Sequence, residues 1–106
     1  MNFSDFQERS RRTLNMKLGA NDAIANYAMG LAGEAGETAD YLKKILFHGH
    51  EMNIEKVVEE VGDVLFYCAA LGTVMGFDLG EAAEANIRKL MKRYPEGFSQ
   101  EKSRER

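Results

Sequence analysis

The chain has little of several residues and features that define other classes of protein. It contains one cysteine, Cys68, so no disulfide can form within the chain, as is typical of proteins in a reducing compartment. Its single proline, Pro95, lies near the end of the 106 residues and leaves the preceding sequence free to form long helices. No apolar stretch approaches the roughly 18 residues that span a bilayer, and the first residues lack the pattern of a signal peptide. We therefore expect a cytoplasmic protein that does not enter a membrane.

The chain also lacks a strong excess of charge of either sign. Its net charge is −3 at pH 7, which argues against a broad electrostatic grip on nucleic acid, so no nucleic-acid polymer is expected as a partner. Hydrophobic residues make up 44% and charged residues 29%, the balance of an ordinary globular protein. The length corresponds to one domain, which we assign to residues 1–98, followed at residues 99–106 by a charged tail that we expect to be frayed.

Apolar residues recur at helical spacing in four segments of the chain. They predict helices over residues 2–18, 22–47, 54–76 and 79–94, and therefore an all-α domain with a four-helix bundle. Because the helices are long and the chain is short, a monomer would bury little apolar surface. We therefore expect a dimer or a larger assembly.

Three glycines recur at every third position inside the second predicted helix: Gly30, Gly33 and Gly36. Glycine is less favourable than alanine inside a helix by about 1 kcal/mol, so the pattern calls for an explanation. It indicates either the close approach of another helix or a ligand, or a locally weak helix with a kink.

Two pairs of acidic residues lie at the margins of the predicted apolar stripes. Glu34 and Glu37 are three residues apart on the second predicted helix, and Glu60 and Asp63 are three apart on the third, so each pair shares one helix face. If the two helices pack antiparallel, the four carboxylates face one another and repel unless a cation lies between them. Hard divalent ions prefer oxygen ligands, which predicts a magnesium site. The spacing alone is equally compatible with acids on a solvated helix surface.

Three segments of the sequence together resemble a known family. They are Gly33–Glu37, Glu59–Asp63 with the Val64–Tyr67 that follows, and Asn86–Phe98, which contains the run Arg-Tyr-Pro-Glu-Gly-Phe. This arrangement is similar to that of the MazG-like nucleotide pyrophosphohydrolases, members of the all-α NTP pyrophosphatase superfamily. Gly33 stands where the family signature begins with a glutamate, so this chain has no carboxylate at that position.

The resemblance implies hydrolysis of an NTP or dNTP to the monophosphate and pyrophosphate, with Mg²⁺ as cofactor and Mn²⁺ as a substitute. It also implies a homodimer or a homotetramer built as a dimer of dimers. The residues that it implies for both metal binding and catalysis are Glu34, Glu37, Glu60 and Asp63. Positive or neutral residues predicted to bind the substrate are Asn86 and Lys89 first, then Lys44 and Arg93. One of the four acids, or the neighbouring Glu59, would act as the base towards the attacking water.

Two other functions are compatible with the same residues. The first is an enzyme of narrow base specificity that resembles the dUTPases and dCTPases of the superfamily. The second is a non-catalytic helical oligomer that binds a nucleotide or a metal. No residue in the sequence is recognisable as a reader of the base.

Overall fold

The structure, a computed structural model, describes residues 1–106 and contains helices but no strand, which confirms the all-α prediction. In chain order the elements are α1 (Phe3–Ser10), the 3-10 turn η1 (Arg11–Thr13), α2 (Ala20–Phe47), α3 (Ile54–Met75), α4 (Leu79–Arg93) and α5 (Gln100–Arg104). None of these helices combines the length and the apolar character that crossing a lipid bilayer requires.

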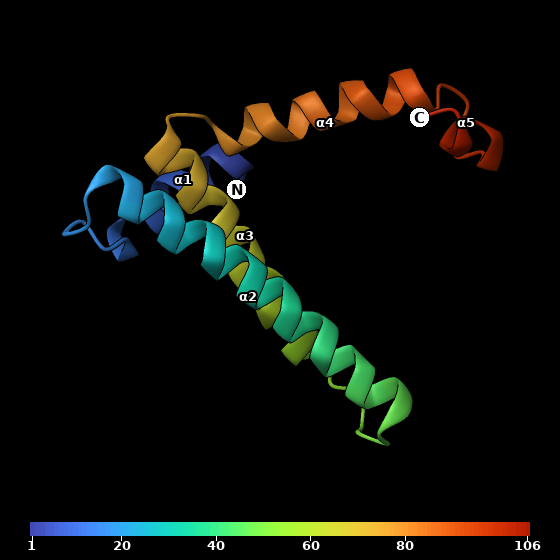
Figure 1. Cartoon of the computed structure of the whole chain (residues 1–106), viewed down its shortest axis with the longest axis horizontal. Helices are drawn as coiled ribbons and strands as arrows, with labels where there is room; N and C mark the ends of the chain where they lie inside the picture. Colours follow the sequence, from blue (N-terminus) through green and yellow to red (C-terminus); the bar gives the residue numbers. More distant parts are fainter.

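The two longest helices, α2 and α3, form an antiparallel hairpin that is the body of the molecule (Figure 1). The side chains buried between them are small or aromatic: Ala23 and Tyr27 from α2 and Ala70 from α3. Beside them the ring of Tyr27 lies 6.2 Å from that of Tyr67, measured between centroids. At the far end of the hairpin Asn53 caps α3, because its side chain accepts from the backbone N–H of Glu55 at 3.0 Å.

Of the three glycines in α2, one lies at a close contact with α3. A Cβ built on Gly30 would overlap the ring of Tyr67 and would lie 2.6 Å from its Cζ. A Cβ on Gly33 or Gly36 would meet no other part of the molecule within 4 Å. Close packing therefore explains Gly30, and α2 continues as one helix through all three positions.

Replacing Gly30 with alanine should destabilise the protein by about 1–3 kcal/mol, because the Tyr67 ring is held by Tyr27 and Phe66 and cannot move away freely. The matched control is Gly33→Ala on the same helix, which should be neutral or stabilising by up to about 1 kcal/mol through helix propensity. Urea unfolding at equal protein concentration measures both. Equal stabilities of the two variants would contradict the close contact.

The first helix is shorter than the sequence analysis predicts. It ends at Ser10, and after the turn at Arg11–Thr13 the chain is extended at Leu14, so the predicted helix over residues 2–18 is wrong beyond its first half. The reason is that this segment makes tertiary contacts with the hairpin. Leu14 and Leu18 pack as loop residues against the core of the hairpin, and the backbone N–H of Asn15 donates to the hydroxyl of Tyr27 at 2.9 Å.

A buried glutamine fixes the point where α4 leaves α3. Gln7 of α1 donates through Nε2 to the carbonyl of Phe77 at 2.9 Å and to the hydroxyl of Thr73 at 3.3 Å. Its Oε1 accepts from the backbone N–H of Leu79 at 2.6 Å. Gly76 ends α3 in the left-handed conformation, with φ of 83°. The direction of α4 is thus set by α1 and by the end of α3.

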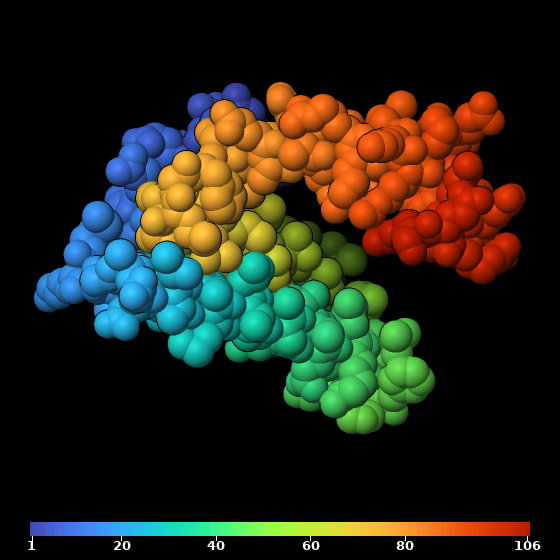
Figure 2. All heavy atoms as spheres, turned by 45° about the horizontal axis from the view of Figure 1, so that its top comes forward, coloured from blue at the N-terminus to red at the C-terminus, as the bar shows by residue number.

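Beyond this corner α4 extends away from α2 and α3, and α5 lies at its end (Figures 1 and 2). The space-filling view shows an open hollow between the α4–α5 arm and the far half of the hairpin (Figure 2). The radius of gyration is 16.7 Å, whereas a compact chain of this length would have about 13 Å. The helices are those of the predicted bundle, but within one chain the fourth does not close it. The tail that we expected to be frayed contains the five-residue helix α5.

Much of the predicted core is exposed within the single chain, and only six residues are buried. Residues of the predicted apolar stripes that are exposed include Leu46, Val61, Met75, Ile87, Leu90 and Met91. The accessible surface is 7975 Å², whereas a compact monomer of this mass would expose about 5,900 Å². The apolar residues of the stripes recur as predicted, but the single chain leaves these members of them exposed.

Candidate metal and nucleotide site

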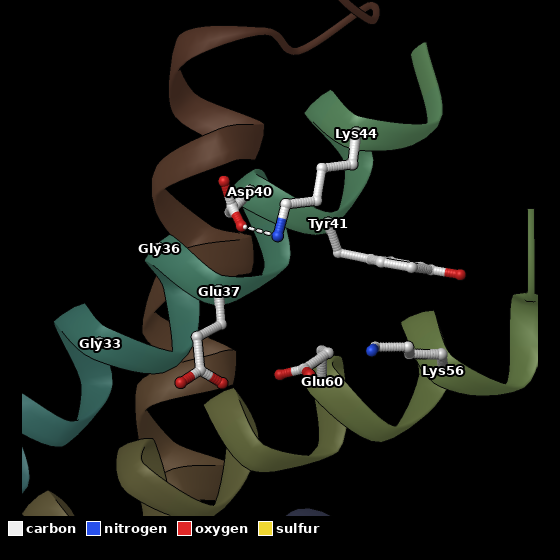
Figure 3. A pocket seen from close by; sticks show the side chains of 8 residues that line it. All are labelled: Gly33, Gly36, Glu37, Asp40, Tyr41, Lys44, Lys56 and Glu60. Carbon is white, nitrogen blue, oxygen red and sulfur yellow. Dashed lines mark ion pairs between the residues drawn. The ribbon is translucent and has the colours of Figure 1, made fainter. Parts of the chain in front are cut away.

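Three of the four predicted carboxylates converge between α2 and α3. Glu34, Glu37 and Glu60 each offer an oxygen, and these oxygens lie within 4.8 Å of one another. The first two are neighbours on α2 because they are three residues apart, and the antiparallel packing brings Glu60 of α3 opposite them (Figure 3 shows Glu37 and Glu60). The arrangement is the one expected for a cation held by carboxylates from two helices.

Two of these carboxylates have an oxygen that is buried and has no hydrogen-bond partner: Oε2 of Glu34 and Oε2 of Glu60. Buried polar atoms without partners are rare in folded proteins. Removal from water raises the pKa of Glu34, and the negative charges of Glu37, Asp63 and Glu60 raise it further. The residues present therefore fit a divalent cation, which would provide the missing partner for both oxygens.

Asp63 lies one turn after Glu60 on α3 and outside the group of three converging oxygens. Its carboxylate is still close enough to contribute to the raised pKa of Glu34. The structure thus brings Glu34, Glu37 and Glu60 together and leaves Asp63 at the edge of the cluster.

A pocket of about 420 Å³ opens beside the carboxylates (Figure 3). It is lined by Gly33, Gly36, Glu37, Asp40, Tyr41, Lys44, Lys56 and Glu60. The predicted substrate residue Lys44 lies in this wall, where its Nζ is 2.9 Å from a carboxylate oxygen of Asp40. Hydrogen bonds from Lys44 and Lys43 lower the pKa of Asp40 to about 2. Asp40 is therefore ionised at neutral pH and holds Lys44 in place beside Glu37.

The other three predicted substrate residues lie on α4, which contacts α1 and the end of α3. Lys89 and Arg93 line a second pocket of about 540 Å³ on this arm, and Asn86 lies one turn before Lys89. The remaining residues of that pocket are Lys92, Pro95, Lys102, Glu105 and Arg106. Within one chain these residues do not line the pocket beside the carboxylates, which is formed by α2 and α3 alone.

Two residues of the site were not singled out by the sequence analysis: Asp40 and Tyr41. Tyr41 follows Glu37 by four residues, and Asp40 follows it by three, so both lie on the same face of α2. That spacing was visible in the sequence. Lys56, which precedes Glu60 by one turn, lies in the opposite wall with its Nζ 4.9 Å from the centre of the Tyr41 ring.

Comparison with known proteins agrees with this geometry. The profile of the MazG nucleotide pyrophosphohydrolase domain matches residues 23–98, which include the carboxylates of α2 and α3 and all of α4. The chain belongs to the MazG family. The Gene 37 protein of Mycobacterium phage L5 is 34% identical to this MazG chain over 83 residues, which cover 74% of the chain and 73% of the phage protein. No solved structure matches the chain significantly.

Membership of the family implies a pyrophosphohydrolase in the broad sense, since MazG proteins are nucleotide pyrophosphohydrolases that generally depend on a divalent metal. The cluster of Glu34, Glu37 and Glu60 is the feature of this MazG chain that fits that dependence. Gly33, which replaces the first acid of the family signature, lines the pocket. It leaves open space where a side chain would otherwise lie.

The raised pKa of Glu34 predicts how stability depends on pH. Because its folded-state pKa lies above the unfolded value, ionisation of Glu34 opposes folding at neutral pH, and this penalty is relieved as the pH falls through the raised pKa. In buffer with EDTA, lowering the pH from about 7 towards the ordinary glutamate value of 4.5 should raise the Tm of the wild type relative to that of Glu34→Gln. Asp40 stays ionised over this window, and His48 and His50 are present in both proteins, so the difference isolates Glu34. Parallel pH profiles of the two proteins would contradict the raised pKa.

Proposed function

We propose that this MazG protein hydrolyses a nucleoside or deoxynucleoside triphosphate to the monophosphate and pyrophosphate, with Mg²⁺ as cofactor. The observation that carries the proposal is the convergence of Glu34, Glu37 and Glu60 on one point, with two buried oxygens that have no partner. The oxygen of water bonds to one of the two phosphorus atoms of the α–β anhydride, and the bond from that phosphorus to the bridging oxygen breaks. The bridging oxygen leaves with the other product, and the protons of water are released or taken up by the products. The family assignment supports the reaction class.

The four carboxylates Glu34, Glu37, Glu60 and Asp63 would hold the metal in this proposal. Bound Mg²⁺ would neutralise phosphate charge and lower the pKa of a coordinated water. Without a cation the carboxylates would repel a triphosphate, which carries about four negative charges, so the same cluster could not bind the substrate alone. The negative charge of the cluster is what makes the proposed activity metal-dependent.

In this proposal two lysines bind the phosphates. Lys44 and Lys56 lie in opposite walls of the pocket beside Glu37 and Glu60, one from each helix (Figure 3). Lys44 is partly exposed and is directed by its ion pair with Asp40, and Lys56 is exposed. Positive groups placed beside the substrate favour the binding and orientation of anionic phosphates.

We further propose that two chains associate and that α4 of one chain completes the pocket of the other. The accessible surface exceeds that of a compact monomer by about 2,000 Å², which is the scale of an obligate homodimer interface. The exposed stripe of Ile87, Leu90 and Met91 gives α4 an apolar face to bury. Asn86, Lys89 and Arg93 lie on the same arm and would reach the substrate only through such an arrangement.

Amide variants test the metal site. Glu34→Gln, Glu37→Gln, Glu60→Gln and Asp63→Asn should each lower turnover by roughly 100-fold or more, because each removes a charge needed to hold Mg²⁺. Pyrophosphate release from a panel of NTPs and dNTPs measures the loss and reports any base preference. Without metal each amide should leave Tm unchanged or higher, since it relieves repulsion, whereas Mg²⁺ should raise the Tm of the wild type much more than that of the variants.

Glu96→Gln is the control for these variants, because Glu96 lies after α4 and outside both pockets. It should change neither turnover nor the stabilisation by Mg²⁺. If all four amide variants kept wild-type turnover and wild-type stabilisation by Mg²⁺, the carboxylates would be ordinary surface acids and the proposed function would fail.

Mixed assemblies test the contribution of α4 from a second chain. Glu60→Gln and the double variant Lys89→Ala/Arg93→Ala should each be nearly inactive and should sediment as dimers or larger assemblies. When the two are co-expressed, half of the dimers are mixed, and each mixed dimer contains one intact site. Activity should therefore return to about a quarter of the wild type in a two-site dimer.

The control pair is Glu60→Gln co-expressed with Glu34→Gln, in which every site lacks one carboxylate and no activity should return. A stable monomer, or mixed dimers as inactive as their parents, would show that α4 does not serve a neighbouring chain.

A further inference from the structure

The pocket beside the carboxylates has one aromatic side chain, Tyr41, and every other lining residue is a glycine or carries a charge. The hydroxyl of Tyr41 accepts from the backbone N–H of Asn53 at 3.2 Å and lies 3.5 Å from the carbonyl oxygen of Glu51. Both residues belong to the loop between α2 and α3. The ring is therefore tethered at its far end while its body remains in the pocket wall (Figure 3).

The charged end of Lys56 lies over one face of this ring. The ammonium group of Lys56 lies 4.9 Å from the ring centre and reaches it from the opposite helix. A cation over an aromatic face is weakly attracted when the site is open to water. A phosphate group attracts an ammonium ion more strongly, because both carry full charges. A bound triphosphate would therefore draw Lys56 away and uncover the ring.

Three kinds of group that a nucleotide needs lie together in this pocket: carboxylates for a metal, lysines for the phosphates and an aromatic ring for the base. The carboxylates of Glu37 and Glu60 lie at one end, and Tyr41 and Lys56 lie beside each other one turn away along their own helices (Figure 3). Gly33 and Gly36 precede Glu37 on α2 and leave the wall on that side of it without side chains. A volume of about 420 Å³ falls within the range of pockets that hold small molecules.

We propose that the ring of Tyr41 is the platform on which the base of the nucleotide stacks, and that Lys56 leaves the ring for the phosphates when substrate binds. The inference rests on the proposed function, because it assumes that the pocket takes a nucleotide. Stacking on an aromatic face accepts every base, since each base has a π-face. The platform thus gives affinity with little discrimination, and the substrate class is nucleoside triphosphates of mixed base identity.

The experiment compares ligands that do and do not carry a base. The ligands are the four NTPs and inorganic tripolyphosphate, each with Mg²⁺, and the measurements are Kd by calorimetry and KM by pyrophosphate or phosphate release. Tyr41→Leu should weaken binding of all four NTPs roughly ten-fold and leave tripolyphosphate unchanged. Tyr41→Phe keeps the ring but loses the hydrogen bonds to the loop, so it should bind NTPs more tightly than Tyr41→Leu does and leave tripolyphosphate binding unchanged.

A second variant serves where Tyr41→Leu does not fold. The chain contains no tryptophan, so Tyr41→Trp introduces a single fluorescent indole into the pocket. Its emission should be quenched by NTPs and unchanged by tripolyphosphate. Equal quenching by both ligands, or none by either, would overturn the platform, as would equal weakening of NTP and tripolyphosphate binding in Tyr41→Leu.

The two proposals fail in different ways. Nucleotide turnover that does not depend on the ring would overturn the platform alone. Ring-dependent binding of NTPs without turnover would overturn the proposed hydrolysis alone. A wild-type protein that binds no NTP in the presence of Mg²⁺ would overturn both.

Discussion

The close packing of α2 on α3 is the constraint on which the rest of the structure depends. Gly30 lets the Tyr67 ring lie against the backbone of α2, and the small side chains of Ala23 and Ala70 keep the two helices near each other. Helices at this separation force carboxylates on their facing margins together. The repulsion between Glu34 and Glu60 is thus built into the hairpin, and packing elsewhere along α2 and α3 has to offset it.

The positive groups of the site are arranged so that they do not neutralise these acids. Asp40 forms ion pairs with Lys43 and Lys44, and Lys56 lies over the ring of Tyr41. None of the ion pairs in the chain involves Glu34 or Glu60. The negative charge of the cluster is therefore not neutralised by a lysine or arginine of the chain. Lys44 and Lys56 lie close by, where they could bind an anion. A site of this kind is suited to a metal and a phosphate bound together.

The corner at Gln7 joins two parts of the molecule that differ in how much of their apolar surface is buried within the chain. The hairpin has a small core of its own, whereas α4 projects with an apolar stripe that its own chain leaves exposed. Because Gln7 holds both the end of α3 and the start of α4, the arm has a fixed direction before it meets any other surface. If two chains associate as proposed, the arm therefore loses little conformational freedom, and the entropic cost of association is lower.

The sequence by itself determined the helices and the acid pairs, because both are local patterns. The periodic apolar residues predicted four long helices, and the predicted limits of α2, α3 and α4 fall within two residues of the observed ones. The spacing of three put Glu34 with Glu37 and Glu60 with Asp63 on shared faces. The first helix was predicted too long, since the pattern of Leu14 and Leu18 serves a loop that packs on the hairpin core.

Only the tertiary structure decided which predicted groups meet. The way α2 and α3 cross puts Gly30 at their close contact. Gly33 and Gly36 instead line the open pocket. It also brought Tyr41 and Lys56 together and kept α4 away from the carboxylates of its own chain. Helical spacing fixes neighbours within one element, but the register and crossing of two elements depend on how all their side chains pack. Contacts between distant segments could therefore not be read from the spacing alone.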